Sequence, residues 1–107
     1  MSEEARTPEK LWAAIAKDQL AKRGVTSGTG FGANEGLRVS GKIFAMLVRG
    51  ELVVKLPKDR VDELVDAGAA RRFDGGKGRP MKEWASVPVS ASRRWKGLVE
   101  EAKTFVG

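Results

Sequence analysis

The segment from Leu37 to Pro57 alternates apolar and polar or small side chains, and two pairs of turn residues interrupt it. Alternation with a period of two is typical of β-strands, because successive side chains point to opposite faces of a sheet. We expect tight turns at Ser40-Gly41 and at Arg49-Gly50, where Gly50 is available for positive φ. The segment therefore predicts three consecutive antiparallel strands, and their apolar faces must be covered by other elements.

The middle strand of this meander, Lys42 to Val48, is apolar on both faces. Strict alternation places Ile43, Ala45 and Leu47 on one face, and it places Phe44, Met46 and Val48 on the other. A strand of this kind is typical of the centre of a sheet that is covered on both sides. We therefore expect this strand to be central.

Three helices are predicted, in the N-terminal, middle and C-terminal parts of the chain. The first has Thr7 as N-cap and Pro8 in the first helical position, and it ends before Gly24. The second covers residues 58–68, and the third runs from about residue 92 to residue 106 with the clearest apolar stripe in the chain. Residues 26–36 are expected to form an irregular crossing or a short strand, residues 70–73 extend briefly, and residues 82–89 form another strand.

With 107 residues, the chain is long enough for one hydrophobic core and too short for two ordinary domains. The order of helix, three strands, helix, one or two strands and helix predicts a single α+β domain over residues 1–107. Residues 1–6 are expected to be a disordered tail, and the glycine-rich residues 74–80 a mobile loop. The expected core consists of Ile15, Leu20, Phe44, Leu47, Val54, Leu64, Trp84, Trp95, Leu98 and Val99.

The composition excludes several classes of site. Without cysteine or histidine, the chain has no disulfides, no thiolate metal sites and none of the usual general bases. The acidic residues of the second helix are spaced as its solvent face, and the glycines around Phe31 and Lys77 lack the strand–turn–helix context of nucleotide-binding loops. We therefore expect no enzyme activity, no catalytic residues, no cofactor and no metal. The acidic N-terminus and the lack of a long apolar run predict a soluble cytoplasmic protein without membrane contact.

All of the excess positive charge lies in one segment. Between Ala70 and Lys96 there are eight cations and two carboxylates, which equals the +6 of the whole chain. The eight candidate nucleic-acid-binding residues are Arg71, Arg72, Lys77, Arg79, Lys82, Arg93, Arg94 and Lys96. Such a segment indicates either contact with nucleic acid or another polyanion, or a positive face that is simply solvated. Trp84 offers a stacking surface, although a tryptophan on an alternating strand is more often part of the core.

Arg93 and Arg94 are expected in the first turn of the last helix. The helix dipole disfavours a cation there by about 0.3–1 kcal/mol. Two explanations remain open: an anion bound at the free amides of that turn, or an exposed turn in which water screens the penalty.

Several short motifs resemble the N-terminal domain of the TfoX/Sxy competence regulators. They are Phe31-Gly32, Gly41-Lys42, Phe44-Ala45 and Lys55, followed by Ala67-Gly68, Phe73, Gly78-Arg79 and Val87-Pro88. The related MmcQ/YjbR-like proteins share this pattern. The resemblance implies an α+β domain with a curved antiparallel sheet and a role in transcription or another DNA-related process in bacteria. TfoX proteins usually carry a second, helical domain that this chain is too short to hold, so competence regulation is not carried over.

The residues and the resemblance together predict a non-enzymatic regulatory or binding domain that contacts nucleic acid through a basic surface. The alternative is a protein–protein interaction module of a bacterial regulator, whose partner is another protein or a second copy of the chain.

Overall fold

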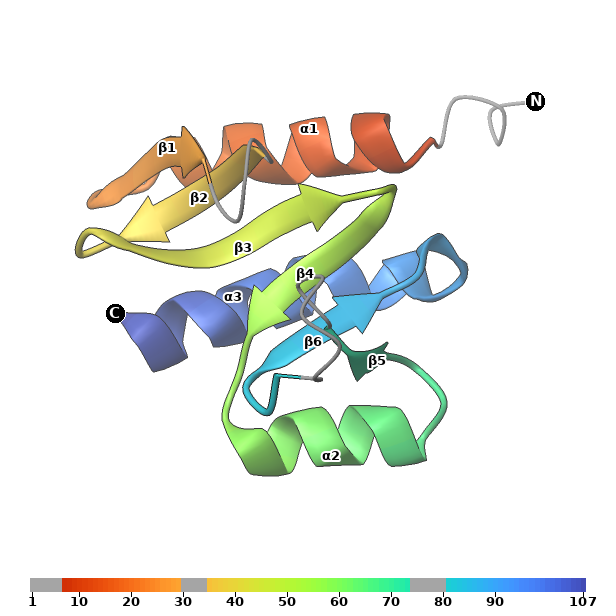
Figure 1. Cartoon of the computed structure of the whole chain (residues 1–107). Coiled ribbons are helices and arrows are strands. Elements are labelled where there is room, and N and C mark those ends of the chain that lie inside the picture. The colour runs from red at the N-terminus through yellow and green to blue at the C-terminus, as the bar shows by residue number, and fades with distance from the viewer. Residues whose placement is uncertain (1–6, 30–34, 74–80) are drawn as a thin grey trace.

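The computed structural model describes residues 7–29, 35–73 and 81–107. Within them, three α-helices, six strands and one 3-10 helix follow one another along the chain (Figure 1). They are α1 (Pro8–Leu20), β1 (Val25–Thr29), β2 (Glu35–Val39), β3 (Lys42–Val48), β4 (Glu51–Lys55), α2 (Lys58–Asp66), β5 (Arg71–Arg72), β6 (Trp84–Val87), η2 (Val89–Arg94) and α3 (Trp95–Val106). The predicted α+β class is confirmed. The expected tail, residues 1–6, and the expected loop, residues 74–80, lie outside the described residues.

The strands form one open antiparallel sheet in the order β1-β2-β3-β4-β6-β5. The predicted meander is present as β2, β3 and β4. The sheet then departs from chain order, because β6 lies between β4 and β5 (Figure 1). As a result, β5 is attached to the sheet through a strand that comes after it in the chain.

The two predicted turns are confirmed, and their dihedral angles explain their sequences. Ser40 and Gly41 have φ of 55° and 77°, and Arg49 and Gly50 have φ of 50° and 79°. Two consecutive positive φ values are the signature of the type I′ hairpin turn, whose twist matches that of the flanking strands. A non-glycine residue tolerates this conformation at some cost in energy, which Ser40 and Arg49 both bear.

A β-bulge changes the faces that simple alternation predicts for β3. Leu37 pairs with Ala45, but the next residue, Arg38, pairs with Ile43, so Phe44 is an additional residue in β3. Because a bulge interrupts the alternation, Phe44 and Ala45 both belong to the hydrophobic cluster beneath the helices, and Ile43 contacts the cluster on the opposite face. The predicted separation of Phe44 from Ala45 is therefore wrong.

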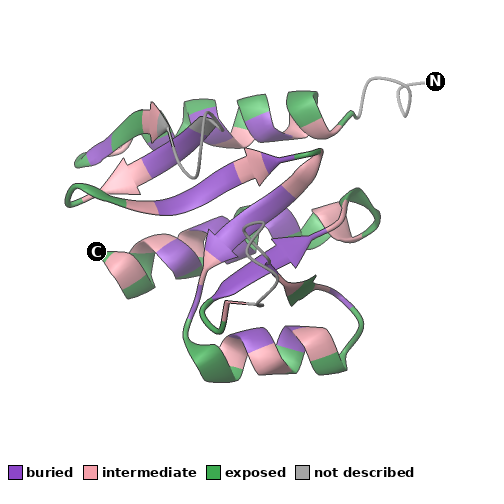
Figure 2. Ribbon diagram, viewed as in Figure 1, coloured by how far each residue is buried: buried purple, intermediate pink, exposed green. Residues whose placement is uncertain are grey.

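The sheet carries an apolar cluster on each face, so most residues of β3 and β4 and all four of β6 are buried (Figure 2). The larger cluster joins the sheet to all three α-helices, including Trp12 of α1, Val61 of α2 and Trp95 of α3. The smaller cluster lies on the face away from these residues and consists of Met46, Val48, Val53, Phe73 and Trp84, with Ile43 and Met81 partly buried against it. The expectation of a central strand covered on both sides is confirmed.

Most of the predicted core is confirmed, but Leu20 is not part of it. Seven of the ten expected residues are buried, whereas Ile15 and Leu47 pack against the core and are only partly buried. Leu20 is 43% exposed, because the buried face of α1 follows Trp12, Ala16 and Gln19. Leu20, the final residue of the helix, is rotated past the edge of this face.

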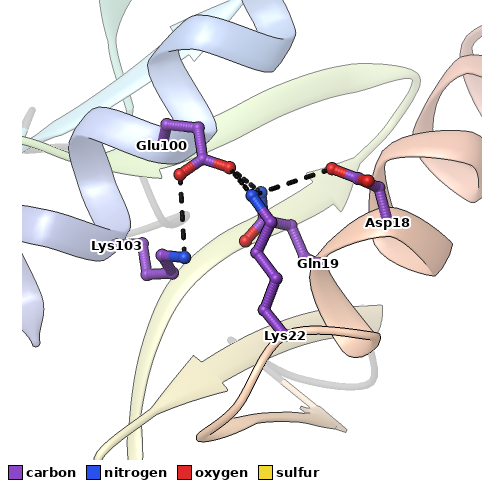
Figure 3. Close-up of polar contacts among 5 residues, drawn as sticks. All are labelled: Asp18, Gln19, Lys22, Glu100 and Lys103. Carbon is purple, nitrogen blue, oxygen red and sulfur yellow. Dashed lines mark hydrogen bonds and ion pairs between the residues drawn. The ribbon is translucent and has the colours of Figure 1, made fainter.

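The end of α1 is joined to α3 by a polar cluster centred on Glu100 (Figure 3). The buried Gln19 donates through Nε2 to Glu100 Oε2 at 2.6 Å, and Lys22 Nζ forms an ion pair with the same oxygen. Lys103 contributes a second cation, 3.6 Å from Glu100 Oε1. The hydrogen bonds from Lys22 and Gln19 lower the pKa of Glu100, and the hydrogen bond to Glu100 raises the pKa of Lys22. Glu100 is therefore held in its charged form between the two helices.

Candidate nucleic-acid interface

The structure describes six of the eight candidate cations. Lys77 and Arg79 lie outside the described residues. The six are distributed over three places: Arg71 and Arg72 form β5, Lys82 precedes β6, and Arg93, Arg94 and Lys96 lie where η2 meets α3. Lys82 and η2 are at opposite ends of β6, so the structure does not bring all six together.

The two arginines of β5 point to different faces and already have carboxylate partners. Arg71 Nη2 donates to Glu51 Oε1 of β4 at 2.9 Å, although the side chain of Arg71 remains 74% exposed. Arg72 donates to Asp62 of α2, on the side of the sheet that the helices cover. The charge of Arg72 is thus paired with a carboxylate of α2, whereas most of the Arg71 side chain is exposed to solvent.

Arg93 and Arg94 are the last residues of the 3-10 helix η2, and the prediction that they form the first turn of α3 is wrong. The backbone leaves helical geometry at Ala91, and α3 begins at Trp95, whose indole Nε1 donates to Pro88 O at 3.3 Å. Arg94 is nevertheless the N-cap of α3, Lys96 lies in its first turn, and neither an acidic residue nor a side-chain cap is present there. In the described part of the chain, no carboxylate pairs with Arg93, Arg94 or Lys96.

Two neighbouring hollows are lined by residues of the β3–β4 turn, β5 and the segment around β6. The larger, of about 300 Å³, is lined by Val48, Arg49, Glu51, Arg71, Arg72, Phe73 and Ser86. The smaller, of about 200 Å³, is lined by Glu51, Gly68, Ala70, Arg71 and Pro88. Arg71 and Glu51 line both, so the β3–β4 turn, β5 and the start of η2 lie at one end of the molecule (Figure 1). We call five cations the basic edge: Arg49 and Arg71, which line the larger hollow, and Arg93, Arg94 and Lys96, which follow at the junction of η2 and α3; Arg72 is left out because it is paired with Asp62.

Arg49 is the member of the basic edge that sequence reasoning missed. It lies outside the segment that carries the excess charge, and it was interpreted only as a turn residue. Its position before Gly50, at the tip of a hairpin, was the available signal, because residues at the tips of such turns project into solvent.

Ser86 and Glu51 form the polar side of the larger hollow. Ser86 is 5% exposed and donates through Oγ to Glu51 Oε1 at 2.6 Å, the oxygen that also accepts from Arg71. The hydroxyl and the guanidinium thus position this carboxylate from two strands. In residues 7–29, 35–73 and 81–107, no group of acidic side chains is arranged to hold a metal ion.

Trp84 belongs to the core and does not offer a stacking surface. The side chain is only 7% exposed, and it packs with Met46, Val53 and Phe73. Lys55 Nζ lies 5.7 Å from the centroid of its ring, within the range of a cation–π contact.

Large exposed apolar side chains, which a protein partner would contact, are spread over the described surface. They are Leu20 of α1, Val89 of η2 and Phe105 of α3. Apolar residues exposed singly in this way are normal for a folded domain. None of the helices in the described part of the chain is long and apolar enough to cross a lipid bilayer.

The comparison with protein families matches residues 20–102 to the family YjbR. The chain belongs to the YjbR family. The match begins at the end of α1 and continues into α3, so it includes every strand and the basic edge. A search of curated proteins finds no match. Of the two related families that the sequence resembles, the YjbR-like one is therefore confirmed.

Proposed function

We propose that this YjbR domain is a non-enzymatic binding domain that contacts nucleic acid through the basic edge. The observation that carries the proposal is the meeting of Arg49 and Arg71 at one pocket; Pro88, the residue before η2, lines the adjoining hollow, and η2 ends in Arg93 and Arg94. Glu51 is the one carboxylate among the described residues that line the two hollows. Because guanidinium groups present several donors in a fixed plane, they bind phosphate oxygens well.

One further consideration supports a polyanionic partner. The resemblance to TfoX N-terminal domains favours a DNA-related role in transcription. Contacts to phosphates carry little sequence information, so we expect binding that depends strongly on salt and weakly on sequence.

Fluorescence anisotropy with a labelled duplex and a labelled single strand tests the proposal. Each phosphate contact contributes about −0.9 to the slope of log K against log salt on duplex DNA. Four contacts therefore give a slope of about −3.6. The double variant Arg93→Glu/Arg94→Glu is expected to flatten the slope by at least about 1.8.

The matched control is Arg23→Glu/Lys42→Glu, which changes the net charge by the same amount. Both side chains are exposed, and Lys42 begins β3, at the far end of that strand from Arg49. This control is expected to keep most of the slope, because a local interface depends on where the charges lie. Equal effects of the two double variants would show that only net charge matters. Absence of binding to either nucleic acid at low salt would leave the basic edge as a solvated surface.

A further inference from the structure

The larger hollow differs from the rest of the basic edge, because it is concave and chemically mixed. Its volume of about 300 Å³ is at the lower end of the range of small-ligand pockets, about 300–1,000 Å³. The β3–β4 turn, β5 and β6 each contribute lining residues. A pocket of this size accepts a single phosphate together with the small group to which it is attached.

The arginines of this pocket have N–H groups that are not used in contacts within the described residues. Arg71 uses Nη2 for Glu51, which leaves the other N–H groups of its guanidinium for a ligand. Arg49 has no carboxylate partner in the described part of the chain, and the type I′ turn holds it at the rim. Because Arg72 is engaged by Asp62, the cations available to a ligand are Arg49 and Arg71. Two arginines that line one hollow suit an anionic group with several acceptor oxygens.

The same pocket also offers an acceptor and an apolar surface. Ser86 and Arg71 both donate to Oε1 of Glu51, so Oε2 remains available to accept a hydrogen bond from a ligand. The side chain of Glu51 is 23% exposed, which leaves it accessible from the pocket. Phe73 and Val48, both almost fully buried, form the apolar part of the lining. The ligand that fits combines a phosphate, a hydrogen-bond donor and a flat or apolar body.

We propose that this pocket binds a nucleoside phosphate monoester, with Arg49 and Arg71 on the phosphate and Glu51 accepting from the sugar or the base. A phosphate monoester carries about −1.5 to −2 charges at pH 7, and it is attracted by Arg49 and Arg71, whose charges the carboxylate of Glu51 offsets only in part. The same chemistry occurs in a free nucleoside monophosphate and at the phosphorylated 5′ end of a strand. Binding of a strand end rests on the proposed nucleic-acid function, whereas binding of a free nucleoside monophosphate does not.

Amide NMR shifts on the ¹⁵N-labelled protein test the pocket directly, with deoxyadenosine 5′-monophosphate as probe and deoxyadenosine as its phosphate-free counterpart. The nucleotide is expected to shift the amides of residues 49–51, 71–73 and 86, and the nucleoside is expected to bind at least tenfold more weakly. Equal binding of the two probes, or shifts confined to other residues, would overturn the inference.

Two variants test the assigned side chains. Arg49→Asn keeps the turn, because asparagine tolerates positive φ before glycine, and Arg71→Gln keeps a shorter polar side chain without the charge. Each is expected to weaken nucleotide binding at least tenfold. Ser40→Asn introduces the same residue at the equivalent position of the other hairpin; it is the control for the turn and is expected to leave the affinity unchanged within twofold. If Arg49→Asn binds the nucleotide as the parent does, Arg49 is not part of the site and the inference fails.

A comparison of 5′-phosphorylated and 5′-hydroxyl single strands distinguishes the two sources. A preference of at least tenfold for the phosphorylated strand, lost in Arg49→Asn, would identify a strand end as the ligand. Nucleotide binding without binding to any strand would support the pocket and refute the proposed function. Strand binding that ignores the 5′ phosphate, together with no nucleotide shifts, would support the proposed function and refute the pocket.

Discussion

Replacing Phe44 by alanine tests whether the bulge in β3 directs this ring into the main core. Phe44 is 0% exposed and belongs to the cluster that joins the sheet to the helices. It is the additional residue of the bulge, and α3 packs on β3. Because backbone and helices surround the ring, its removal leaves a cavity that the surroundings can fill only in part.

The expected loss in the free energy of unfolding follows from the complete burial of the Phe44 side chain. Replacing a buried phenylalanine by alanine costs about 3–5 kcal/mol, from lost transfer free energy and from the cavity. Domains of this size are stable by about 5–15 kcal/mol, so the variant loses a large share of its stability. At about 4–8 °C per kcal/mol, the melting temperature is expected to fall by about 12–40 °C.

Urea unfolding followed by tryptophan fluorescence measures this loss, because Trp12, Trp84 and Trp95 are all buried. Phe105→Ala is the matched control: the same side chain is removed from α3, but from a position that is 41% exposed, and we expect a loss below about 1 kcal/mol. The urea dependence of the free energy of unfolding must be the same in parent and variants for the comparison to hold. Equal losses for the two phenylalanines would refute the placement of Phe44.

Three further predictions concern turns, charge and helix propensity. Ser40→Asn is expected to stabilise the fold by a few tenths of a kcal/mol up to about 1 kcal/mol, because Asn-Gly is the preferred type I′ pair; thermal unfolding measures this, and a loss would contradict the turn assignment. Glu100→Gln is expected to destabilise the protein at pH 7. Since the folded state lowers the pKa of Glu100 from 4.5, its contribution is present above that value and is lost as the pH falls through the folded pKa. Urea unfolding should show the difference from the parent narrowing as the pH is lowered below 4.5, and a constant difference would exclude a role for the charge. Gly97→Ala is expected to stabilise α3 by about 0.5–1 kcal/mol, because the added Cβ meets no atom within 4 Å. Gly68→Ala, at φ of 75°, is expected to destabilise the protein by about 1 kcal/mol or more. Thermal unfolding should show changes in melting temperature of opposite sign for the two variants.

Local patterns predicted the elements of the fold well, because hairpin turns and helix caps are encoded within a few residues. Thr7 caps α1 as expected, and its Oγ1 accepts from the amide of Lys10 at 3.2 Å. The bulge at Phe44 was not predictable in this way. A bulge is defined by a mismatch between two strands, and the alternation within β3 alone carries no sign of it.

The candidate site was predicted in part, for a related reason. Counting charges along the chain identified Arg71 and the cations before α3, but it treated every cation in the segment alike. Arg72 is paired with Asp62, which the sequence placed on a solvent face, and Arg71 shares Glu51 with Ser86. These partners are 10–35 residues away in sequence, so only the tertiary structure shows which cations are free to meet a ligand.

The position of β6 between β4 and β5 has a consequence for how the chain acquires its structure. The β2–β3–β4 meander contains only local pairings, so it can assemble early, but β4 then has an open edge until β6 is available. In the described sheet β5 pairs with β6 alone, so Arg71 cannot take its place beside Glu51 before residues 84–87 have been made and have docked. During synthesis, the pocket is therefore among the last features to form, and a chain truncated before β6 lacks it. A ligand of the pocket would therefore stabilise only those chains whose sheet is already complete.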